Sequence, residues 1–145
     1  MFSDFLSRLT QPKPDPLVDD DARLALTALL VRIARSDSDY ADTEMARIDR
    51  ISAERFGLSP FEAAALRSQA EDLEAEAPDT VRFTRAIKEA VAYSDRLGVV
   101  QAMWSVVLAD GQRTGEEDSL LRLVVSLLGV SDVDSALARQ KAAKS

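Results

Sequence analysis

Apolar residues recur every three or four positions along most of the chain, which is the period of an α-helix packed on one side. Phe83, Ile87 and Val91, for example, lie on one continuous helical stripe. Residues that typically end or begin helices separate such stripes: Gly57 suits a helix end, and Ser59 before Pro60 suits a helix start. No segment shows the strict alternation of a strand. The pattern therefore predicts an all-α protein, a compact bundle of about seven helices.

Helices are expected over residues 24–33, 43–56, 59–78, 80–91, 94–110, 116–128 and 131–140, with Ser94 as the cap of the fifth. The first of these is apolar around most of its circumference and should lie near the centre of the fold. Six apolar residues on the inward faces of these helices are expected to face the core: Phe61, Ala65, Leu66, Leu73, Phe83 and Trp104. Arg82 and Arg85 are expected at a solvated edge.

The two halves of the sequence resemble each other. Asp37 aligns with Asp110 and Glu44 with Glu117 at the same spacing, and Phe56-Gly57-Leu58-Ser59 aligns with Leu128-Gly129-Val130-Ser131 after one residue is dropped. The preceding apolar helices match as well, with Leu30, Val31 and Ile33 aligned to Met103, Trp104 and Val106. We therefore predict an internal duplication of a helix–acidic turn–helix unit, whose copies pack together with equivalent residues at equal depth.

The N-terminus has a different character. Phe2, Phe5, Leu6 and Leu9 recur at helical spacing within residues 1–10, and residues 11–16 contain three prolines. We expect a short amphipathic segment at 1–10, a linker at 11–16 and one helical domain at 17–145. The segment is interpreted as a flap on the domain; peripheral membrane association through residues 1–10 is the alternative.

Composition narrows the classes of function. With 25 acidic and 18 basic residues the net charge is −7, so nucleic acid is not expected as a partner. The chain has no cysteine and no histidine, which leaves carboxylates, hydroxyls and lysines for any chemistry. It shows neither a signal-peptide pattern nor a run of roughly 18 apolar residues. We expect a soluble cytoplasmic protein without a transmembrane segment.

Carboxylates gather at the two turns of the duplicated unit, and Asp37, Asp39, Glu44, Asp110 and Glu117 are the candidate metal ligands. Such oxygen clusters suit Ca²⁺ or Mg²⁺, although the spacing is not that of an EF-hand loop. Helix capping explains the same residues, because Thr114 and Glu117 have the spacing of a capping box. The sequence leaves metal binding, capping and partner contacts open, and it identifies no catalytic or cofactor-binding residue.

Five stretches together resemble the tellurite-resistance TerB family, over residues 24–139: 34–44, 54–59, 81–85, 108–117 and 128–131. The paired Ala-Asp-Gly turn followed by glutamate is the most specific of these, and the first copy departs from it at Ser38 and Ala41. The resemblance implies an all-α fold with two similar halves, related in shape to the N-terminal domain of the co-chaperone DjlA. It also implies a link to tellurite resistance and stress response, without an established catalytic activity.

Two hypotheses of function follow. The first is a non-catalytic TerB-like module that binds a divalent cation weakly at its acidic turns. The second is a protein-interaction adaptor or co-chaperone-like domain, whose acidic turns only cap helices or contact a partner. Both imply an unidentified protein partner.

Overall fold

A computed structural model describes residues 2–36, 40–108 and 115–144, and for residues 115–117 it describes the backbone alone. These parts contain eight α-helices and no strand, as the apolar spacing predicts. The helices are α1 (Ser3–Leu9), α2 (Asp19–Ala34), α3 (Asp42–Phe56), α4 (Pro60–Glu76), α5 (Thr80–Ala90), α6 (Tyr93–Leu108), α7 (Gly115–Leu127) and α8 (Asp132–Lys144). The expectation of about seven helices did not count α1.

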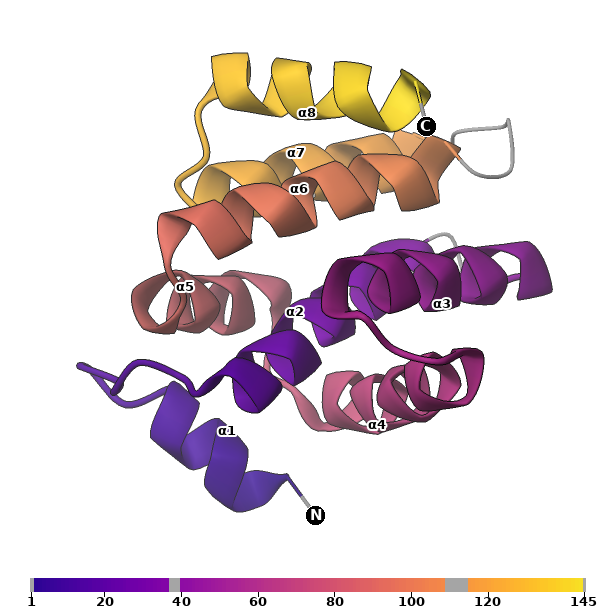
Figure 1. Cartoon of the computed structure of the whole chain (residues 1–145). Coiled ribbons are helices and arrows are strands. Elements are labelled where there is room, and N and C mark those ends of the chain that lie inside the picture. The colour runs from indigo at the N-terminus through magenta and orange to yellow at the C-terminus, as the bar shows by residue number, and fades with distance from the viewer. Residues whose placement is uncertain (1, 37–39, 109–114, 145) are drawn as a thin grey trace.

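Helix α2 runs through the middle of the bundle, and α3, α4, α5, α6 and α7 contact it (Figure 1). Its side chains are buried almost without interruption from Leu24 to Val31, which explains why its sequence is apolar around most of the helix. Helices α6, α7 and α8 form one end of the molecule, and α3 and α4 lie beside α2 at the other (Figure 1). One continuous core joins both groups.

The duplication is evident in the burial of equivalent residues. Leu30, Val31 and Ile33 of α2 are buried, and so are their partners in α6: Met103, Trp104 and Val106. Within α3 and α7, Ile48 and Leu121 are equally inaccessible. The predicted equivalence of depth is therefore confirmed at these positions.

The helix ends repeat as well. Gly57 and Gly129 both have positive φ, 65° and 71°. In each case the next residue donates its backbone N–H to a carbonyl five residues earlier, Leu58 to Ala53 at 3.1 Å and Val130 to Val125 at 3.2 Å. This hydrogen bond satisfies a carbonyl that the end of the helix would otherwise leave unpaired.

The repeat is longer than the predicted hairpin, because a third helix follows each glycine. Ser59 Oγ accepts the Glu62 N–H and Ser131 Oγ accepts the Asp134 N–H, both at 3.1 Å. Helix α4 packs along α2 as α8 packs along α6. Small residues enter both interfaces at the same spacing, Ala63 and Ala70 in α4, Ser135 and Ala142 in α8.

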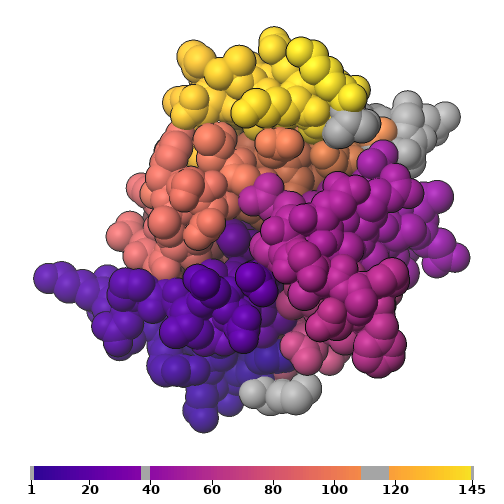
Figure 2. Space-filling view, in the orientation of Figure 1, coloured from indigo at the N-terminus to yellow at the C-terminus, as the bar shows by residue number. Residues whose placement is uncertain are grey.

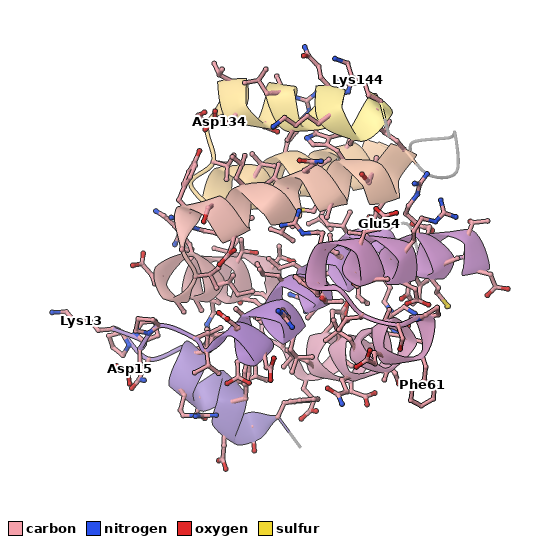
Figure 3. All side chains as sticks on the ribbon, viewed as in Figure 1. Lys13, Asp15, Glu54, Phe61, Asp134 and Lys144 are labelled. Carbon is pink, nitrogen blue, oxygen red and sulfur yellow. The ribbon has the colours of Figure 1, made fainter. Side chains whose placement is uncertain are left out.

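Three local expectations were wrong. Phe61 is 83% exposed and projects away from the bundle (Figure 3), and Ala65 is also exposed. Leu73 faces the core as expected, but the other inward residues of α4 are Ala63 and Ala70, because small residues allow this helix to approach α2 closely. Helix α6 begins at Tyr93, so Ser94 lies inside it and is not its cap.

Helix α1 is part of the folded body. Phe5 and Leu9 are buried in the common core, while Phe2 and Leu6 pack partly against it. The apolar face of this segment is therefore covered by the domain, as the flap interpretation predicts. No described helix is both long and apolar enough to cross a membrane.

Candidate functional site

The predicted metal ligands can be followed only in part. Asp37, Asp39 and Asp110 lie outside the described residues, and Glu117 is described only through its backbone, as the third residue of α7. Glu44 is the third residue of α3 and only 1% exposed. The parts of the chain that are described hold no group of three or more potential ligand residues.

Glu44 performs the capping role expected of a carboxylate at this position. Its Oε1 accepts the backbone N–H of Ala41, the residue before the helix, at 3.4 Å. Ala41 offers no side-chain cap in return, so this is half of a capping box. Glu117 occupies the same third position in α7.

The residues on both sides of the first turn, Arg35 and Tyr40, lie beside carboxylates of α4. Before the turn, Arg35 lies 3.6 Å from a Glu74 carboxylate oxygen and 5.1 Å from the ring centre of Tyr40, which follows the turn. Burial and then the neighbouring Glu71 carboxylate raise the pKa of Tyr40, so its phenol stays protonated. Arg67 of α4 pairs with Asp49 of α3 at 2.7 Å, which joins the two helices, and with Glu71 of its own helix at 2.9 Å.

A cleft of about 260 Å³ lies where the two repeats meet, between α2, α3 and α6. Figure 2 shows this hollow, with α2 at its bottom between α3 and α6. The buried part of its lining is mainly apolar but includes the hydroxyl residues Thr27 and Ser52. The apolar lining residues are Leu26, Leu30, Ile51, Val99 and Ala102, and the charged residues at the rim are Asp19, Arg23, Arg55 and Asp95. The Arg23 guanidinium lies 5.0 Å from the ring centre of Phe56, which shapes one wall.

A glycine of α6 leaves room for an arginine of α3 at this cleft. A Cβ at Gly98 of α6 would lie 1.9 Å from Arg55 Nη2, so only glycine leaves room for the guanidinium in its present position. Glycine inside a helix costs roughly 0.5–1 kcal/mol relative to alanine. Gly98 interrupts the apolar pattern of α6 without ending the helix, and this was the one signal in the sequence for a close approach here.

A second groove of about 310 Å³ continues the cleft along α3 and α6, sharing Ile51, Arg55 and Ala102 with it. Its other lining residues are Arg47, Arg50, Glu54, Gln101 and Ser105. Glu54 lies on the edge of α3 that faces α6 (Figure 3). Sequence reasoning missed these residues, because the pairing of α3 with α6 is a contact between distant segments.

Comparison with known families gives one match, to the sequence model described as tellurite resistance protein TerB, over residues 23–140. The chain belongs to the TerB family. No curated protein and no solved structure matches it. The N-terminal helix α1 and the linker precede the matched region, as the resemblance of residues 24–139 implies.

Trp104 of this TerB-family chain is a core residue rather than part of a ligand cage. It is 6% exposed, and its Nε1–H donates to Ser135 Oγ of α8 at 3.2 Å. Arg139 covers the ring at 5.1 Å from its centre. The Trp104 ring borders an open groove of about 680 Å³ between α6, α7 and α8, and Phe83 is fully buried, as predicted.

Proposed function

We propose that this chain is a non-catalytic binding module of the TerB family, which receives a protein partner in the cleft between its repeats. The cleft carries the proposal: its buried lining is mainly apolar with two hydroxyl groups, its rim is charged, and α2, α3 and α6 of both repeats form it. Sites that bind a partner side chain combine such an apolar interior with a few polar groups that fix orientation. The match to a family described as tellurite resistance protein TerB supports a role in tellurite resistance, and a link to stress response is part of the same proposal.

The absence of catalysis is part of this proposal. Asp19 and Asp95, the carboxylates of the cleft, are exposed at its rim. General acid–base groups are usually carboxylates or imidazoles held in desolvated sites, and the sequence contains no histidine. The chemistry that the cleft offers is thus recognition by shape and charge.

In-cell photo-crosslinking tests whether the cleft is the partner surface, whatever the partner's chemistry. A photoreactive residue replaces Glu54 at the groove edge, and in a control variant it replaces Glu89, an exposed glutamate of α5 outside the cleft. We expect a discrete cross-linked species from position 54 and none from position 89. Equal products from both positions, or none from either, would refute the cleft as the binding surface.

A weak cation site at the acidic turns is the second candidate. It is favoured by the structural equivalence of Glu44 and Glu117, which follow the two turns at the same helical position. Sites with few carboxylates and no dedicated cage have dissociation constants on the order of 10⁻⁴ to 10⁻³ M for Ca²⁺. The second turn is expected to bind more strongly, because it keeps Gly111 where the first has Ser38.

Calcium titration followed by amide chemical shifts tests this candidate. The native protein is compared with Glu117→Gln, which removes the charge while keeping the size of the side chain. We expect saturable shifts near the second turn in the native protein and a loss of these shifts in the variant. Equal binding by both proteins excludes the second turn, and no saturable binding below roughly 10 mM leaves capping as the role of these carboxylates.

A further inference from the structure

The groove along α3 and α6 has the opposite charge to the protein as a whole. The chain carries a net charge of −7, yet the charged side chains of this groove are Arg47, Arg50 and Arg55 against Glu54 alone. Within the described parts of the chain, none of these three arginines forms an ion pair. Three guanidinium groups are therefore available to an anionic ligand at this surface.

The second repeat shows that folding does not require arginine at two of these positions. At the spacing that aligns Glu44 with Glu117, Arg47 corresponds to Leu120 and Arg50 to Leu123. Between them Ile48 corresponds to Leu121, and both are fully buried. The inward position thus keeps its apolar character in both copies. The flanking positions differ: Leu120 packs partly against the core and Leu123 is exposed, where the first copy has arginines. A role other than folding explains why one copy has arginines there.

The dimensions of the groove fit a short extended peptide. Arg47 and Arg55 are eight positions apart on α3, a distance of about 12 Å at 1.5 Å per residue. An extended chain advances about 3.3 Å per residue, so roughly four residues span this length. Gln101 and Ser105, one turn apart on α6, offer hydrogen bonds opposite the arginines. The adjoining cleft, lined by Leu26 and Val99, has room for one apolar side chain.

We infer that the groove binds an acidic peptide segment of a protein partner, about four residues long, with an apolar residue beside it. This inference rests on the proposed function and specifies its ligand. Carboxylates pair with guanidinium groups through two parallel hydrogen bonds, which gives the arginines both charge and geometric selectivity. A long polyanion fits less well, because the negative charge of the remaining surface repels it.

Fluorescence anisotropy with a defined probe tests the ligand class. The probe is a fluorescein-labelled peptide of four glutamates followed by one leucine, titrated with the full chain at low salt and at about 0.15 M, where the Debye length is about 8 Å. The test variant is Arg47→Gln with Arg50→Gln. The control, Arg82→Gln with Arg85→Gln, makes the same change in net charge on exposed residues of α5 outside the groove.

We expect saturable binding that weakens on the order of tenfold in the groove variant, because exposed charge pairs each contribute modestly. The control should bind like the native protein, and changing the leucine of the probe to alanine should weaken binding further. Equal weakening in both double variants, or equal binding of a lysine peptide, would overturn the inference. Tighter, arginine-dependent binding of an RNA oligonucleotide or of phosphatidylserine vesicles would also overturn it. Cross-linking from position 54 without peptide binding would refute only the acidic peptide as the ligand. The proposal that the chain is a binding module would still stand.

Discussion

Replacing Trp104 with alanine removes the only tryptophan of the chain from the interface between α6 and α8. The native side chain is 6% exposed, donates a hydrogen bond to Ser135 and stacks beneath Arg139. Alanine loses all three contributions at once. Because α8 packs mainly along α6, the substitution weakens the main contact that holds the C-terminal helix to the rest of the protein.

The magnitude follows from the buried area. Burying a large aromatic side chain removes about 150–250 Å² from water, which at about 25 cal/mol per Å² is about 4–6 kcal/mol. Denatured chains already bury roughly 10–40% of this area, which reduces the difference to about 3–5 kcal/mol. That range agrees with the cost of truncating buried aromatic residues generally. The open groove beside the ring lets water or neighbouring side chains fill part of the space that the ring leaves. The expected loss of stability therefore lies in the lower half of this range.

Urea unfolding followed by circular dichroism at 222 nm measures this change in the free energy of unfolding. Phe61→Ala is the matched control, because it also truncates an aromatic residue but one that is 83% exposed. We expect the control to change stability by less than about 0.5 kcal/mol. A Trp104→Ala protein as stable as the control would show that the ring is not buried against α8, and would refute both the packing and its role in the core.

Two further predictions concern the helix ends. Gly57→Ala and Gly129→Ala should each destabilise the protein by about 1 kcal/mol, because both glycines have positive φ that alanine adopts only with strain; urea unfolding without a measurable change would refute the equivalence of the two ends. The backbone and side chain of Ser59 donate hydrogen bonds that lower the pKa of Glu62 in the folded protein. This carboxylate therefore stabilises the folded state at pH values above its unfolded pKa. The stabilisation is lost as the pH falls through the folded pKa. Glu62→Gln should therefore be less stable than the native protein at neutral pH and equally stable in acid, whereas a difference that persists in acid would exclude this linkage.

Much of the fold could be predicted because local rules determine it. The positive φ of Gly57 and the cap of α4 by Ser59 follow from residue types at fixed positions, and the buried α2 follows from its composition. Phe61 was misplaced because its size suggested burial. In the structure, helix–helix distance decides instead, and the close approach of α4 to α2 selects small residues such as Ala63 and Ala70 for the interface.

The candidate cleft was not predictable in the same way, because it depends on which helices meet. Arg47 and Gln101 are far apart in sequence, and nothing in the local pattern of either helix indicates that they share a groove. Along the sequence, the carboxylates concentrate at the acidic turns instead. The structure gives Glu44 a local explanation as a helix cap, so proximity in sequence was a poor guide to a shared site.

The internal duplication offers a way to separate folding from function within a single chain. Both copies must bury the same helix faces, so positions that folding determines stay apolar in both, as Ile48 and Leu121 do. Outward positions carry no such requirement. Arg50 in the first copy corresponds to Leu123 in the second, and Leu123 is exposed. Because the two copies share one architecture, a difference at such positions reflects what each surface contacts. The arginines of the groove therefore belong to the first repeat alone, and a partner that recognises them approaches the molecule from one side of α3.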